Sequence, residues 1–202
     1  MKIAVIGESN IDIAVAPHAE LNAKCCVPGD IAFHHGGVAR NIAHNLCLLG
    51  HDVKLVSVFG DDDFAERMVA DCKQIGMDLS LSDQFKEAKS PIFLSFNDNT
   101  GNMVSAVSDV SLNDYMDLDW LKDKMAAINT SDVVVADTLL STNALAVPAV
   151  FLVDHTHDVR IPRGDVVGDL AGAILGAVVD DEDLHPLPAG KQAFDAFFHV
   201  VL

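Results

Sequence analysis

The chain has 202 residues, of which 30 are Asp or Glu and 13 are Lys or Arg, so its formal net charge is -17 at pH 7. This charge argues against a protein that binds nucleic acid, because phosphate backbones are held by clusters of Lys and Arg that the sequence lacks. Half of the residues are hydrophobic, which argues against a disordered chain and is enough to form a buried core.

The length predicts one domain over residues 1–202, since domains usually have about 100–200 residues. No apolar stretch reaches the roughly 20 residues of a membrane-spanning helix, and the start of the chain has no signal-peptide cleavage site. The four cysteines form no C-x-x-C pair and are expected to be reduced structural thiols. We therefore expect a soluble, cytoplasmic protein that does not bind membranes.

The first elements in chain order are two short strands. Residues 3–6 form an apolar run that ends at Gly7, and residues 11–15 alternate between apolar and polar or small side chains. The turn between them lacks the G-x-G-x-x-G pattern that opens a helix in dinucleotide-binding folds. A nicotinamide-dependent oxidoreductase therefore has little support.

Helices and strands then alternate. A helix is predicted to begin at the glycine pair of residues 36–37 and to end at Gly50, and it is followed by a strand over 53–58 and a helix over 64–75. Residues 91–96 and 102–107 predict a β-hairpin, because residues 97–101 between them are typical turn residues.

The last predicted elements are a helix over 118–128 and two buried strands over 133–136 and 150–153, which end at Asp137 and Asp154. This alternation predicts an α/β fold with a mainly parallel sheet and an inserted hairpin. Ligands bind such sheets at the carboxyl ends of the strands.

Two histidine pairs, His34-His35 and His155-x-His157, are candidate metal ligands. Their spacing and context are more typical of loops than of a metal site, so no metal-binding residue is predicted.

The segment 36–41 is the most informative one. Its two glycines allow a ligand to approach the backbone closely, and the first turn of the following helix presents Arg40 and Asn41. Taken alone, a double glycine before a helix is as often only a tight turn.

Three ordered motifs give this segment a context. Residues 7–12 (GESNID), 36–46 (GGVARNIAHNL) and 58–64 (VFGDDDF) resemble, in order and spacing, the PfkB family of carbohydrate and nucleoside kinases. Residues 37–43, 108–110 and 136–138 are most similar to the pseudouridine kinase branch of that family. The resemblance covers roughly residues 1–154.

The resemblance implies a ribokinase-like three-layer α/β fold with a small β lid, formed by elements around 11–15 and 91–107. It implies ATP-dependent phosphorylation of a ribose-containing small molecule such as pseudouridine, with Mg²⁺ on the nucleotide. Asp12 would accept hydrogen bonds from sugar hydroxyls, Asn10 would assist it, Gly36 and Gly37 would let the sugar pack on backbone, and Asn41 would bind another hydroxyl. The lid would exclude water and would also form a homodimer contact.

The resemblance places the catalytic base at Asp169. Family members carry a G-A-G-D motif at the start of a late helix, and its counterpart here is residues 166–169, of which only Gly168 and Asp169 match. Asp169 would take the proton of the sugar hydroxyl, and the amide of Gly168 would help to form the anion hole for the phosphoryl group. Val166 and Val167 would crowd that turn.

A second departure concerns the ATP site. The chain has no N-x-x-E motif, which organises magnesium and phosphate in the family, and it is shorter by about a third than a domain of roughly 300 residues. Two explanations stay open: a shortened or degenerate kinase, or a chain that lacks part of the working protein. The alternative function is accordingly a non-catalytic sugar-binding or regulatory module of the same family.

Overall fold

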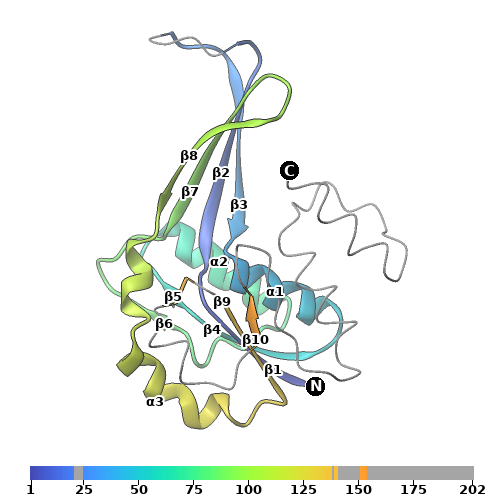
Figure 1. Cartoon of the computed structure of the whole chain (residues 1–202), viewed down its shortest axis with the longest axis vertical. Coiled ribbons are helices and arrows are strands. Elements are labelled where there is room, and N and C mark those ends of the chain that lie inside the picture. Colours follow the sequence, from blue (N-terminus) through green and yellow to red (C-terminus); the bar gives the residue numbers. More distant parts are fainter. Residues whose placement is uncertain (21–24, 138, 141–150, 154–202) are drawn as a thin grey trace.

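A computed structural model describes residues 1–20, 25–137, 139–140 and 151–153. Two parts stand out in Figure 1: a body in which helices pack on a sheet, and a second sheet that rises from one end of this body. We call the second one the projecting sheet.

The body contains a parallel sheet of four strands in the order β10-β9-β1-β4. These strands are β1 (Lys2–Ile6), β4 (Asp52–Val56), β9 (Val133–Asp137) and β10 (Phe151–Val153). All three neighbouring pairs are parallel, which confirms the predicted parallel sheet. The central strand β1 is entirely buried from its second residue onward.

Helices cover both faces of this sheet. Ile3 and Val5 of β1 belong to one core with α1 (Val38–Leu48) and α2 (Asp63–Gln74). Ala4 and Ile6 belong to a second core with the 3-10 turn η1 (Ser111–Tyr115) and α3 (Leu118–Ile128). Because successive side chains of a strand point to opposite faces, β1 supplies both cores. The predicted three-layer α/β arrangement is confirmed.

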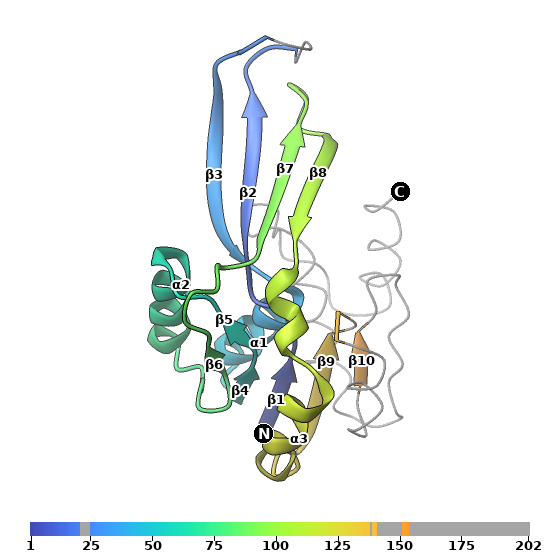
Figure 2. The same cartoon turned by 90° about the vertical axis from the view of Figure 1, so that its left-hand side faces the viewer.

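The projecting sheet has the order β3-β2-β7-β8, as Figure 2 shows from its broad side. Its strands are β3 (Gly29–Gly36), β2 (Asn10–Pro17), β7 (Ile92–Asn97) and β8 (Met103–Asp109). Strand β2 pairs with β3 antiparallel and with β7 parallel. The antiparallel pair of β7 and β8 confirms the predicted hairpin.

Strand β3 was not predicted, so the sheet is larger than a hairpin. Six of its eight residues are exposed, and its order comes from a continuous backbone ladder with β2, from Asn10 opposite Gly36 to Pro17 opposite Gly29. A strand held by pairing with a distant segment, and not by burial, leaves a weak pattern in the sequence.

The strand predicted over 53–58 is divided at Ser57. Strand β4 ends at Val56, and the short β5 (Val58–Phe59) pairs instead with β6 (Asp83–Gln84) in a separate sheet. The backbone N–H of Ser57 donates to Ser82 Oγ at 3.1 Å, and its carbonyl accepts from the Asp83 N–H at 3.0 Å. Hydrogen bonds from a crossing loop therefore replace the continuation of the ladder.

The four cysteines are free; Cys72 is buried, Cys47 is half-buried, and Cys25 and Cys26 are exposed. Burial, together with the neighbouring Cys72 and Asp52, raises the pKa of Cys47 to about 11, so this side chain stays a thiol at neutral pH. None of the helices in the described part of the chain is long and apolar enough to cross a membrane.

Candidate acceptor site

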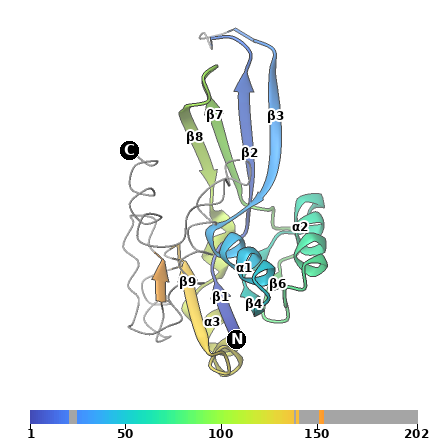
Figure 3. The same cartoon turned by 90° about the vertical axis from the view of Figure 1, so that its right-hand side faces the viewer.

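The residues of the first two motifs meet where the projecting sheet joins the body. Strand β1 ends at Ile6, and the chain turns through residues 7–9 into β2. Asn10, the first residue of β2, pairs with Gly36, the last residue of β3. Helix α1 begins at once after this point. Figure 3 shows β1, β2, β3 and the start of α1 converging there, so the structure brings together five of the predicted site residues: Asn10, Asp12, Gly36, Gly37 and Asn41.

Asn10 and Asp12 form a polar pair on one face of β2. The Asn10 Nδ2 amide donates to Asp12 Oδ1 at 2.8 Å. Asn10 is 6% exposed, and among the described residues its Oδ1 atom has no hydrogen-bond partner. A buried acceptor of this kind is costly unless a donor reaches it. A hydroxyl group of a ligand is a donor of the right size.

The two glycines are required by close approach. A Cβ atom at Gly36 would lie 2.2 Å from Asp12 Oδ2, so the carboxylate occupies the space that any side chain would need. Gly37 has a φ of +96°, and a Cβ there would lie 2.4 Å from the Glu8 carbonyl oxygen. A side chain at Gly36 would force the Asp12 carboxylate to move, and one at Gly37 would collide with the backbone of the 7–10 turn.

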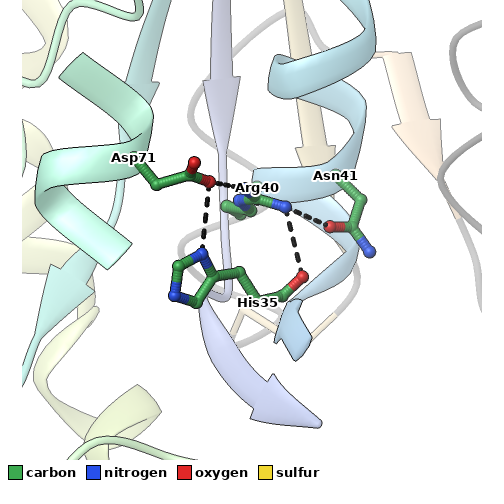
Figure 4. Close-up of polar contacts among 4 residues, drawn as sticks. All are labelled: His35, Arg40, Asn41 and Asp71. Atoms are coloured by element: carbon green, nitrogen blue, oxygen red, sulfur yellow. Dashed lines mark hydrogen bonds and ion pairs between the residues drawn. The ribbon is translucent and has the colours of Figure 1, made fainter. Parts of the chain in front are cut away.

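Asn41 lies in the first turn of α1 beside a buried arginine (Figure 4). Arg40 Nη1 donates to Asn41 Oδ1 and to the His35 carbonyl oxygen, at 3.1 Å each. Arg40 Nη2 forms an ion pair with Asp71 Oδ2 of α2 at 2.6 Å. His35 Nδ1 lies 3.2 Å from the same Asp71 oxygen.

The carboxylate of Asp71 is held in its charged form. Burial alone would raise its pKa, but the hydrogen bond from His35 and the charge of Arg40 outweigh burial and lower the pKa below its usual value. Arg40 therefore faces a permanent negative charge at neutral pH.

Further buried polar contacts fix the turn between β1 and β2. Glu8 Oε1 accepts from Asn113 Nδ2 at 3.0 Å, and the Glu8 carbonyl accepts from the Arg40 N–H at 3.3 Å. The hydroxyls of Ser9 and Ser57 lie 2.9 Å apart. Asp137, predicted at the end of β9, is 1% exposed and accepts from the Leu139 N–H at 2.9 Å. These contacts hold the turn that leads from β1 to Asn10 at the start of β2.

The third motif, residues 58–64, joins α2 to the base of the projecting sheet. Asp62 is the N-cap of α2, and its Oδ1 accepts from the Ala65 N–H at 2.9 Å. Its Oδ2 accepts from the Ser90 N–H at 2.8 Å, just before β7. Burial would raise the Asp62 pKa, but the hydrogen bonds from Ser90 and Ala65 lower it overall. Asp62 therefore stays ionised as a link between the two parts.

Sequence reasoning missed the part played by Arg40, Asp71 and Ser57. One signal was present: Arg40 interrupts a helix face whose neighbours Ala39, Ile42 and Ala43 are buried. A buried arginine needs an anionic partner. The position of that partner, 31 residues away on another helix, could not be read from spacing.

A family model for the pfkB family of carbohydrate kinases matches residues 1–158. The chain belongs to the PfkB family of carbohydrate kinases. Solved structures agree with the fold: a carbohydrate kinase from Agrobacterium tumefaciens superposes with a TM-score of 0.63 at 27% identity, covering 71% of this chain and 47% of that chain. Ribokinase from Thermotoga maritima superposes with a TM-score of 0.65 at 13% identity, covering 99% of this chain and 69% of that chain, which confirms the ribokinase-like fold.

Two curated relatives extend the comparison. Pseudouridine kinase of Escherichia coli (strain K12) is 35% identical over 159 residues, which are 79% of this chain and 50% of the relative. Guanosine-inosine kinase of Exiguobacterium acetylicum is 28% identical over 170 residues, which are 84% of this chain and 55% of the relative. The chain spans about half the length of these PfkB relatives.

The remaining predicted site residues, Gly168 and Asp169, lie outside the described residues, as do Asp154 and the pair His155 and His157. Within the described ranges, no cluster of three or more His, Cys, Asp or Glu side chains is arranged to hold a metal ion. The described residues thus include five of the seven predicted site residues, Asn10, Asp12, Gly36, Gly37 and Asn41.

Proposed function

We propose that this PfkB chain binds a ribose-containing small molecule at the acceptor site and phosphorylates one of its hydroxyls with ATP. The observation that carries the proposal is the Asn10–Asp12 pair, with its buried Asn10 Oδ1 that lacks a partner in the described part of the chain. A diol supplies two hydroxyl donors at the spacing of neighbouring acceptor oxygens.

In this proposal each residue around the pair has one task. Asp12 and Asn10 accept hydrogen bonds from sugar hydroxyls. Gly36 leaves room for the Asp12 carboxylate, and Gly37 lets the 7–10 turn approach the start of α1, so the two glycines keep the hydroxyl-binding side chains in place. Asn41 donates to another hydroxyl of the sugar.

The transfer step that we propose is based on the PfkB family. The acceptor hydroxyl oxygen attacks the γ-phosphorus of ATP, the bond from that phosphorus to the β,γ-bridging oxygen breaks, and ADP leaves. The hydroxyl proton passes to the Asp169 carboxylate, and the Gly168 amide donates to the transferring phosphoryl group. Mg²⁺ would enter with the nucleotide and screen its phosphate charges.

Pseudouridine is the acceptor that we favour. The relatives named pseudouridine kinase, from Escherichia coli and from Arabidopsis thaliana, support this choice. The residues of the acceptor site recognise a ribose and not a base, so ribose and other nucleosides belong in the same assay.

A non-catalytic sugar-binding module is the second candidate. It is favoured by the sequence at Val166 and Val167, whose branched side chains would crowd the turn of the predicted anion hole, and by the lack of an N-x-x-E motif in these 202 residues. It predicts sugar binding that ATP and Mg²⁺ do not change.

The test combines turnover with binding. ADP production by the purified chain is measured with Mg²⁺ and pseudouridine, ribose, uridine, adenosine or fructose, and acceptor binding is measured by calorimetry. We expect Asp169→Asn to abolish turnover with binding kept, and Asp12→Asn to weaken binding by about tenfold or more, as loss of a charged hydrogen-bond acceptor predicts. Full activity of Asp169→Asn would exclude it as the base. Binding without turnover by the wild-type chain would support the second candidate.

We also propose that the chain is a cytoplasmic homodimer formed through the projecting sheet. The register places seven apolar residues on one face of this sheet, which we call the apolar face: Ile13, Val15, Ile31, Phe33, Leu94, Phe96 and Val107. Ile31 and Val107, on the two edge strands, are 60% and 63% exposed. Phe33 and Phe96 are exposed as well, whereas the other three are half-buried. Exposed apolar side chains gathered on one face of a sheet mark a protein contact, and a second copy offers the same face.

A further inference from the structure

We propose that Arg40 is a positioning residue: held by Asp71, it sets the orientation of the Asn41 amide and ties that amide to the end of β3. The inference deepens the proposed function, because it assigns the polarity with which the site meets an acceptor hydroxyl. It concerns a side chain that is 7% exposed and touches three elements.

The guanidinium bridges the two ends of the glycine turn. Nη1 donates both to the His35 carbonyl, which precedes Gly36 on β3, and to Asn41 Oδ1 on α1. The backbone N–H of the same residue donates to the Glu8 carbonyl at 3.3 Å. One residue therefore connects the end of β3, the first turn of α1 and the turn that leads to Asn10.

This contact selects one of the two orientations of the Asn41 amide. An arginine side chain has only donors, so the amide can face it only with its oxygen. The Nδ2 group then lies on the other side, as Figure 4 shows. An acceptor hydroxyl that reaches Asn41 meets a donor, whereas one that reaches Asn10 or Asp12 meets an acceptor. The site thus offers a hydrogen-bond donor at Asn41 and acceptors at Asn10 and Asp12.

Asp71 makes this arrangement permanent. Its carboxylate accepts from Arg40 Nη2 at 2.6 Å and lies 3.2 Å from His35 Nδ1. A buried arginine without an anion would be strongly unfavourable. A lysine could form the ion pair, but its single ammonium cannot also reach the His35 carbonyl and Asn41 with the geometry of a planar fork. The guanidinium is required for position and not only for charge.

The test is a double-mutant cycle on acceptor binding with pseudouridine and ribose. Arg40→Met, Asn41→Ala and the double variant are compared by calorimetry. We expect each single variant to bind about tenfold more weakly, and the double variant to bind no more weakly than Asn41→Ala, because Arg40 acts through Asn41. Arg40→Lys is expected to recover only part of the loss. If the double variant binds more weakly by the product of the two single losses of affinity, the inference is overturned.

A second readout does not depend on any acceptor. The side-chain amide resonances of Asn41, assigned by their absence in Asn41→Ala, report on its hydrogen bond to Arg40. We expect them to shift in Arg40→Met and in Asp71→Asn. The second variant is isosteric and keeps the packing, so it serves as the test if Arg40→Met does not fold. Unmoved resonances in Asp71→Asn and any folded Arg40→Met would overturn the inference, even if the wild-type chain binds no acceptor and the proposed function fails.

The matched control is another ion pair between distant segments. Lys54 Nζ and Asp78 Oδ2 lie 2.5 Å apart, half-buried at the side of the body sheet. Lys54→Met removes an ion-paired cation, 29% exposed, away from the acceptor site, so it is expected to lower the Tm and to leave acceptor binding and the Asn41 resonances unchanged. A shift of the Asn41 resonances in this control would show that they report general loosening, and would overturn their use as evidence for the inference.

Discussion

The two sheets of this molecule are ordered in different ways. Every residue of β1 from Ile3 onward is buried, and helices lie on both faces of its sheet. All seven residues of β8 are exposed, and no helix covers the far part of its sheet in the described residues. The body sheet is held by apolar burial on two faces, whereas the projecting sheet depends on its backbone ladder and on whatever covers its apolar face.

The largest contrast is expected for side-chain truncation. Leu55 of β4 is fully buried in the core shared with α1 and α2, so Leu55→Ala is expected to lower the free energy of unfolding by about 2–5 kcal/mol. Met103 of β8 is 62% exposed, and Met103→Ala is expected to change it by less than about 0.5 kcal/mol. Urea titrations measure both. Equal losses would contradict the division into a burial-ordered and a pairing-ordered sheet.

A charge on the apolar face should act on assembly and not on folding. In Ile31→Asp, we expect the dimer dissociation constant in sedimentation to rise by about tenfold or more, because a carboxylate would be buried without a partner. Ala106→Asp is the control, since Ala106 pairs with Ser95 in a row on the opposite face. A wild-type chain that stays monomeric at high concentration would refute the proposed dimer.

The smallest effect is expected at the tip of the projecting sheet. Hydrogen bonds from the Thr100 hydroxyl and from the Asn102 and Thr100 N–H groups lower the pKa of Asp98 from 3.8 to about 2. The pKa of Asp98 is lower in the folded state than in the unfolded state, so its ionised form stabilises the fold. This stabilisation is complete above pH 3.8 and is lost as the pH falls through about 2.

Carboxyl chemical shifts followed by NMR should give this midpoint for Asp98. The amide of Thr100 should exchange faster in Asp98→Asn, while the urea midpoint of the body stays the same. A midpoint near 3.8 for Asp98 would show that the turn contacts do not hold its charge.

The body could be predicted from the sequence because its strands and helices carry strong local patterns. The apolar run of β1, the helical spacing of α1 and the glycine that follows α2 each reflect burial or a turn that the chain encodes locally. Strand β3 and the interruption at Ser57 were missed, since both depend on pairing with segments that are far away in the sequence.

The residues of the candidate acceptor site could be predicted from the sequence, but the hydrogen bonds and ion pairs that hold them could not. Asn10, Asp12, Gly36, Gly37 and Asn41 were identified by motif, and the structure gathers them at one junction. The link from Arg40 to Asp71 joins two helices and could only be seen once α1 and α2 were in place. The assignments of Asp169 as base and of Gly168 to the anion hole stay predictions.

The junction of the two sheets has a consequence for exchanging parts between relatives. Asn10 and Asp12 belong to the projecting sheet, whereas Asn41 and Arg40 belong to the body. A chimaera that takes only the projecting strands from a relative would import some residues of the proposed sugar site and keep the others. The crossover points of such a chimaera lie after Ile6, before Val38 and at the ends of β7 and β8. Its acceptor recognition would then depend on residues from both parent proteins.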